Sequence, residues 1–256
     1  MGKIGKLMRV LSTVTVVAIM TFSLITDKVS QLRHDTVLSK IEKRTGCKVI
    51  EIVHKPRRGL FGVVQAYLTN EDADRVIDQL NKLSAKDKIL LVLHTGGGEL
   101  LAAYRIANSL KMHEGEVTVA VPYMAMSAGT LIALSADKIL MGQNAVLGPV
   151  DPQFVADGRV YPAVSMLKIP WYKKYDSIND NTITLIDQAQ KAINQVHAMI
   201  ELMVGKEHPG LAKLKTRLVG QMTHDYPIFC NEAIQLGLPV KTDIPKEFYE
   251  LINLAR

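Results

Sequence analysis

Two apolar runs in this sequence each end in small residues and lead directly into a helical pattern. The first run, KILLVLHT, precedes GGGELLAAYRIA, and the second, VTVAVP, precedes YMAMSAGTLIALSA. A short, almost uninterrupted apolar run is typical of a parallel strand that is buried on both faces. Strands that alternate with helices at this spacing form βαβ units. The sequence therefore predicts an α/β domain.

The rest of the chain supplies more elements of the same kind. KVIEIVH and KILMG are predicted strands, and residues 70–83 are a predicted helix with Asn70 as its N-cap. A long helix is predicted over residues 183–204, and shorter helices follow it. The 256 residues suffice for one α/β domain and an appendage. We assign residues 47–256 to this domain.

The N-terminal segment has a different composition. Lys3, Lys6 and Arg9 precede an uncharged, mostly apolar run over residues 10–26, which is at the short end of a bilayer span. We predict that residues 1–26 anchor the chain, as a single-pass protein, in the cell (inner) membrane, and that residues 27–46 form a helical stalk. A cleaved signal peptide is the alternative. Positive charges also follow the run, so the positive-inside rule does not decide on which side of the membrane the catalytic domain lies.

Charge and cysteine usage limit the classes of partner and cofactor. The net charge is +6, but aromatic residues make up only 5% and do not interleave with a basic stripe. This composition argues against binding to nucleic acid. Cys47 and Cys230 form neither a CxxC motif nor a His/Cys ligand spacing, and the seven histidines are scattered. We therefore expect no metal ion and no other cofactor.

Ser127 lies among small residues at the start of a predicted helix. Parallel strands place the turns TGGGE and MSAG along one edge of the sheet, so Gly98, Ser127 and Ala128 are expected to be neighbours. The amides of Gly98 and Ala128 would then point at one oxygen, as in an oxyanion hole. Each motif alone has a simpler interpretation, a plain loop for TGGGE and an N-cap for the serine. Together, each between a strand and a helix, they favour a serine nucleophile.

Three motifs of this chain resemble the serine dehydrogenase proteinase family: HTGGGELLAAYRIA, MAMSAGTLIALSADKILMGQNAVLGPVDPQ and THDYPIFCNEAIQLGLPV. Members are membrane-associated prokaryotic relatives of signal peptide peptidase A and of the Clp protease catalytic subunit. The resemblance covers about residue 48 to the C-terminus. It implies a Clp/crotonase-type fold of stacked ββα units and hydrolysis of peptide bonds in protein or peptide substrates. By this resemblance Ser127 is the nucleophile, Gly98 and Ala128 line the oxyanion hole, and the chain forms a homo-oligomer.

The base that accepts the serine proton is less evident. Clp-type proteases carry a histidine shortly after the nucleophile helix, but the corresponding loop here, AVLGPVDPQ, has none. Signal peptide peptidase A and its relatives use a Ser-Lys dyad instead, with the lysine ahead of a long helix. By this resemblance Lys168 is the predicted base. Its neighbours Met166, Leu167 and Trp171 are apolar, and burial favours a neutral amine.

Other residues stay open as alternatives. Lys173 and Lys174 are the next lysines in the same window. His224, in THDYPI, is the alternative base, although a structural cap is the simpler interpretation of this motif. Asp151, in GPVDPQ, is a turn residue or orients a catalytic group. Asp187 and Lys191 have the spacing of an i,i+4 ion pair on the long helix.

The sequence thus predicts a membrane-anchored serine endopeptidase with a Ser-Lys dyad. A catalytically inactive membrane scaffold of the same fold is one alternative, because the loop histidine is missing. A serine esterase is another, because AMSAG and HTGGG nearly match the α/β-hydrolase motifs and the order Ser127, Asp187, His224 fits that fold. A crotonase-like acyl-CoA enzyme is a third. The apolar face of residues 183–204 favours a closed homo-oligomer.

Overall fold

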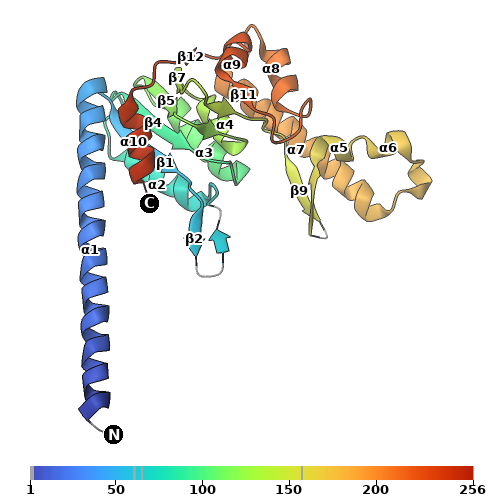
Figure 1. Ribbon diagram of the computed structural model, residues 1–256. Coiled ribbons are helices and arrows are strands. Elements are labelled where there is room, and N and C mark those ends of the chain that lie inside the picture. Colours follow the sequence, from blue (N-terminus) through green and yellow to red (C-terminus); the bar gives the residue numbers. More distant parts are fainter. Residues whose placement is uncertain (1–2, 60–61, 65, 157, 256) are drawn as a thin grey trace.

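The computed structural model describes residues 3–59, 62–64, 66–156 and 158–255. A five-stranded sheet in the order β1-β4-β5-β7-β12 lies at its centre (Figure 1). All neighbouring strands of this sheet run parallel, as the apolar runs predict. The strands are β1 (Lys48–Val53), β4 (Ile89–His94), β5 (Val117–Val121), β7 (Lys138–Met141) and β12 (Val240–Lys241).

Helices cover both faces of the sheet. Because successive side chains of a strand point to opposite faces, Leu91 and Leu93 of β4 lie in one buried cluster and Leu90 and Val92 in another. The first cluster packs against α2 (Asn70–Asn81), α3 (Leu100–Lys111), α4 (Ala128–Ala133), α7 (Asp180–Val204) and α8 (Leu211–Leu218). The second cluster packs against α1 (Lys3–Thr45) and α10 (Lys246–Leu254).

A small second sheet has the strand order β11-β8-β6. Its strands are β6 (Met124–Ala125), β8 (Val146–Leu147) and β11 (Ile228–Phe229), and α9 (Cys230–Gln235) follows the last of them. β6 runs parallel to β8, whereas β11 runs antiparallel to it. The buried hydroxyl of Thr130 joins β6 to the end of β8, since it donates to Ala125 O and accepts from Gly148 N.

Two antiparallel hairpins project from the body (Figure 1). One consists of β2 (Arg57–Gly59) and β3 (Gly62–Val64), and the other of β9 (Gln153–Ala156) and β10 (Arg159–Pro162). Beside the second hairpin, the first turns of α7 extend away from the body. We call this part the extension; it comprises α5 (Ala163–Met166), α6 (Ile169–Tyr172), the 3-10 turn η1 (Tyr175–Ser177) and the start of α7.

The predicted anchor and stalk lie on one continuous helix, α1. The side chains of residues 3–19 and 23 lie outside the described part of the structure, and charged residues follow from Asp27 onward. Over the described residues, we find no helix that is both long enough and apolar enough to cross a bilayer. This finding overturns the predicted location as a single-pass protein of the inner membrane.

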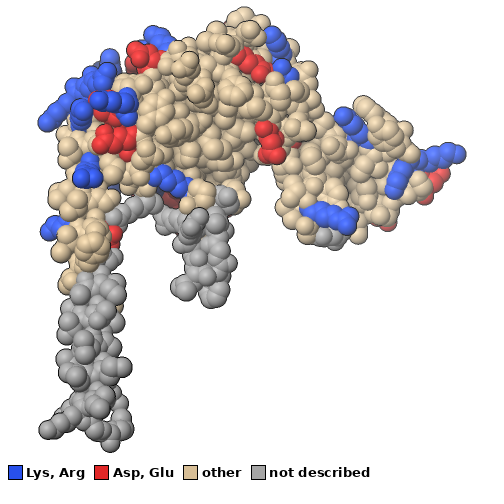
Figure 2. Space-filling model, viewed as in Figure 1, with Lys and Arg blue, Asp and Glu red and all other residues tan. Residues whose placement is uncertain are grey.

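The C-terminal end of α1 belongs to the body of the molecule. Ile41 is buried in the same cluster as Phe248 of α10. Lys40 and Arg44 both pair with Glu247, each at 3.2 Å. Figure 2 shows basic and acidic side chains close together around this end of the helix. The last turns of α1 are therefore held to α10 by both apolar packing and ion pairs.

Candidate active site

Ser127 occupies a sharp turn between β6 and α4. Its φ is 50° and its ψ is −117°, and among the described residues it is the one non-glycine residue with a positive φ. Such a conformation costs about 1–3 kcal/mol and persists only where the surroundings enforce it. Gly129 follows on the inner side of the turn, where a Cβ atom would lie 2.5 Å from the Thr95 methyl group. The small residues around Ser127 therefore reflect close packing of two turns.

The glycine loop after β4 lies directly against this turn. A Cβ atom on Gly97 would lie 2.9 Å from Ser127 Cβ, and one on Gly98 would lie 2.3 Å from the Leu68 carbonyl oxygen. Both glycines have positive φ angles, 108° and 151°. Larger residues would push the loop away from Ser127 or from Leu68, which explains the glycines by their close contacts.

A cavity of about 560 Å³ opens above Ser127. Its polar lining comes from the two turns and from three residues elsewhere in the sequence: Gly96, Gly98, Ser127, Asp151, Gln153 and His224. The structure therefore brings Ser127, Gly98, Ala128 and the alternative base His224 to one cavity. Much of the remaining lining is apolar, including Leu100, Val150, Val155, Val160 and Val196.

His224 and Asp151 form a pair in this cavity. His224 Nδ1 lies 2.7 Å from Asp151 Oδ1, and Gln153 Nε2 donates to the other carboxylate oxygen. The Asp151 side chain is buried, whereas that of His224 is 33% exposed. The hydrogen bond to Asp151 raises the pKa of His224, and partial burial opposes this shift. Asp151 is thus suited to orient His224, whose Nε2 has no hydrogen-bond partner among the described residues.

The small sheet explains why these residues meet. The antiparallel register pairs Ile228 with Leu147. If the same register is continued beyond both strands, it brings Asp151 opposite His224. β6 pairs with β8 in parallel, so Ser127 leaves the sheet at the edge where the Asp151 loop begins. The three-stranded sheet therefore brings Ser127, Asp151 and His224 to the same edge.

Lys168 lies elsewhere in the structure. It is exposed in the turn between α5 and α6, and it is not among the described residues that line the cavity. The predicted burial is wrong because this turn belongs to the extension, where Trp171 is 75% exposed. Lys173 and Lys174 are exposed as well.

Asp187 does not form an esterase-type triad with Ser127 and His224. Its carboxylate pairs with Lys191 at 2.6 Å on the surface of α7. This is the i,i+4 pair that the helical spacing predicts. The partner of His224 is instead Asp151, which sequence order alone did not identify as a member of a triad.

The family model of the ClpP-like SDH-type serine proteinases matches residues 1–256. The chain belongs to this family. It is therefore a serine peptidase, as the motifs around Ser127 predict.

Two relatives from Methanocaldococcus jannaschii are similar to it along most of their length. The uncharacterized protein MJ0137 is 44% identical over 232 residues, which cover 88% of this chain and 79% of the relative. The uncharacterized protein MJ1495 is 38% identical over 222 residues, with 85% and 74% covered.

Solved structures of ClpP-like proteases share the fold of this SDH-type proteinase. A variant of ClpP1 from Listeria monocytogenes matches with a TM-score of 0.50 and 16% identity, over 78% of this chain and 94% of that one. A variant of the 1510-N membrane-bound stomatin-specific protease in complex with a substrate peptide matches with a TM-score of 0.50 and 18% identity. This second match covers 77% of this chain and 75% of that one. The predicted ClpP-like α/β fold is confirmed.

Proposed function

We propose that this protein is an endopeptidase in which Ser127 is the nucleophile, His224 the base and Asp151 the residue that orients the base. The observation that carries this proposal is the 2.7 Å contact between His224 and Asp151 in the cavity that Ser127 also lines. A histidine that donates Nδ1–H to a buried carboxylate presents a basic Nε2. The exposed position of Lys168 gives no comparable support to a Ser-Lys dyad.

The proposed reaction follows from these roles. His224 Nε2 accepts the proton of the Ser127 hydroxyl as the serine oxygen attacks the peptide carbonyl. Negative charge develops on the carbonyl oxygen, and the amides of Gly98 and Ala128 donate to it. The protonated His224 then gives its proton to the leaving amine. Water repeats the sequence on the acyl-enzyme and frees Ser127.

The cavity wall favours a particular class of peptide. Val150 and Val196 line the cavity from the body, and Val155 and Val160 line it from the β9–β10 hairpin. Val155 is largely exposed in the single chain, so a bound segment would cover it. Burial of apolar surface is favourable, and we therefore expect cleavage beside apolar side chains of protein or peptide substrates.

We also propose that the protein self-assembles. The sequence predicts this association from the apolar face of α7. Most apolar residues of that face pack inside the body, among them Ile193, Val196 and Ile200. Exposed apolar surface lies instead on α6, where Trp171 is 75% and Tyr172 81% exposed. Large exposed aromatic side chains are typical of protein interfaces, so the extension is the part we assign to contact between copies.

Replacement of the nucleophile tests the proposed function. Ser127→Ala should abolish cleavage of casein, because no other described residue that lines the cavity carries an aliphatic hydroxyl or a thiol, while thermal unfolding stays cooperative. Ser135→Ala is the matched control, since Ser135 is a buried serine after the same helix whose hydroxyl bonds only Ile132 O among the described atoms. Casein cleavage by Ser127→Ala at the wild-type rate would rule out the proposed nucleophile.

A further inference from the structure

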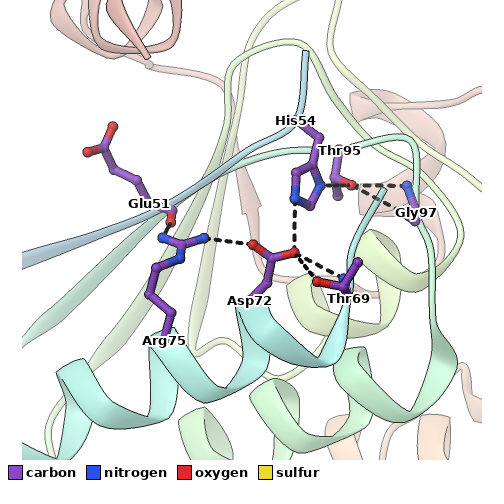
Figure 3. A network of polar contacts seen from close by, with 7 residues as sticks. All are labelled: Glu51, His54, Thr69, Asp72, Arg75, Thr95 and Gly97. Carbon is purple, nitrogen blue, oxygen red and sulfur yellow. Dashed lines mark hydrogen bonds and ion pairs between the residues drawn. The ribbon is translucent and has the colours of Figure 1, made fainter. Parts of the chain in front are cut away.

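A polar network lies behind the glycine loop (Figure 3). His54, just after β1, is at its centre. Its Nδ1 lies 2.8 Å from Thr95 Oγ1, and its Nε2 lies 3.2 Å from Asp72 Oδ2. The side chain of His54 is only 9% exposed and Thr95 is fully buried. Neither is among the described residues that line the Ser127 cavity, so the proposed chemistry does not use them.

Asp72 fixes the orientation of the imidazole. Besides His54, its carboxylate accepts from Thr69 N at 3.0 Å and from Arg75 Nη2 at 2.9 Å. Burial opposes ionisation of Asp72, but the hydrogen bonds from His54, Arg75 and Thr69 outweigh it and hold the pKa of Asp72 well below its usual range. An ionised Asp72 accepts the Nε2–H of His54, and this bond turns Nδ1 toward Thr95.

Thr95 holds the loop in turn. Its Oγ1 accepts from Gly97 N at 3.1 Å, and lies 3.3 Å from Gly97 O. Leu68 N donates to the same carbonyl at 2.8 Å. A peptide unit is planar, with its C=O and N–H on opposite sides. Leu68 N, which fixes the Gly97 carbonyl, therefore also fixes the Gly98 N–H, one of the two proposed oxyanion donors, and Thr95 fixes the adjoining peptide unit through Gly97 N.

Thr95 also contacts the turn that carries the nucleophile. Its N–H donates to Met124 O at 3.1 Å, and its carbonyl accepts from Met126 N at 3.0 Å. One threonine thus links the glycine loop to β6, and His54 contacts its hydroxyl. Because the Thr95 side chain is fully buried, it cannot reach a substrate and serve as a second nucleophile.

We infer that His54 and Thr95 are positioning residues that hold Gly97, and through it the Gly97–Gly98 peptide, in the orientation needed by the oxyanion hole. This inference rests on the proposed function of Ser127. Asp72 and Arg75 support it from α2 by fixing His54. The network orients a donor that acts in the transition state, and it lies outside the peptide-binding surface. Its loss should therefore lower kcat and leave KM almost unchanged.

Two substitutions of Thr95 test the inference. Thr95→Val keeps the shape of the side chain but removes the hydroxyl, whereas Thr95→Ser keeps the hydroxyl. For Thr95→Val we expect kcat on a peptide substrate and the rate of Ser127 labelling by a fluorophosphonate to fall about 10- to 100-fold. This is less than the roughly 10²–10³-fold loss that follows removal of an oxyanion donor. Thr95→Ser should react at nearly the wild-type rate.

Two substitutions of His54 provide a second test that does not depend on how Thr95→Val folds. An asparagine amide takes the place of Nδ1 and retains the bond to Thr95, whereas a glutamine amide takes the place of Nε2 and reaches Asp72 alone. His54→Asn should therefore retain more activity than His54→Gln. His113→Asn is the control, because the His113 ring is hydrogen-bonded as well, to Asp87 O at 2.7 Å, but near the amino end of β4.

The outcomes separate this inference from the proposed function. If the wild-type protein is not labelled at Ser127, the proposed function fails and the positioning role fails with it. If wild type is labelled, and Thr95→Val and both His54 variants react at its rate, only the positioning role is overturned. A rise in KM with unchanged kcat would likewise overturn it, because that pattern reports lost ground-state binding.

Discussion

His224 must be neutral to accept the proton of Ser127. Because its bond to Asp151 raises its pKa, the neutral form prevails only above the ordinary histidine range, near 6.5. We therefore expect kcat/KM on a peptide substrate to rise with pH through this raised pKa and then to stay level.

Removal of the Asp151 charge should shift this profile. Asp151→Asn takes away the group that raises the pKa of His224, so the midpoint of the rise should move to lower pH, while the plateau falls by up to about 10⁴-fold. Asp187→Asn is the matched control, since that carboxylate pairs with Lys191 on the surface. A midpoint that stays in place in Asp151→Asn would count against the assignment of Asp151.

Residues in local turns were the predictable part of the site. The strand, small residues and helix around Ser127 and Gly98 are contiguous in sequence, so their juxtaposition follows from the common edge of a parallel sheet. The pairing of His224 with Asp151 joins residues 73 positions apart and depends on the register of β8 and β11. These strands have two residues each, too short for a periodic pattern to reveal them.

At the scale of elements, the exposed aromatic side chains of α6 predict association between copies. The wild-type protein should scatter light as a closed oligomer at micromolar concentration. Trp171→Ser combined with Tyr172→Ser should shift it toward smaller species, because both side chains are largely exposed on the extension. Met112→Ser changes an equally exposed side chain at the end of α3 and should have no effect. A wild-type protein that is a clean monomer would contradict the proposed assembly.

The extension also shows why local composition misplaced Lys168. Met166 is buried beside the core, but the chain then turns outward, and Trp171 faces solvent. Apolar neighbours in sequence indicate burial only when their element packs against the body. The short helices α5 and α6 have four residues each, and nothing in the sequence gives their direction.

At the scale of the whole molecule, the parallel sheet and its covering helices were predictable, because continuous apolar strands alternate with amphipathic helices. The N-cap of α2 is Thr69, one residue before the predicted Asn70, and the Asp72 carboxylate accepts from Thr69 N there. The packing of α1 against α10 was not predictable, because Ile41 and Phe248 are brought together by the route of the entire chain. The same holds for the network around His54, whose members come from α2 and from the residues that follow β1 and β4.

The identity of the base is the central claim, and one measurement tests it most directly. It is the rate at which a fluorophosphonate labels Ser127 in His224→Gln and in Lys168→Arg, both compared with wild type. We predict that Lys168→Arg reacts at the wild-type rate and that His224→Gln is slower by about 10²–10⁴-fold, the usual contribution of a general base. Wild-type labelling of His224→Gln together with loss of labelling in Lys168→Arg would contradict the account and restore the Ser-Lys dyad.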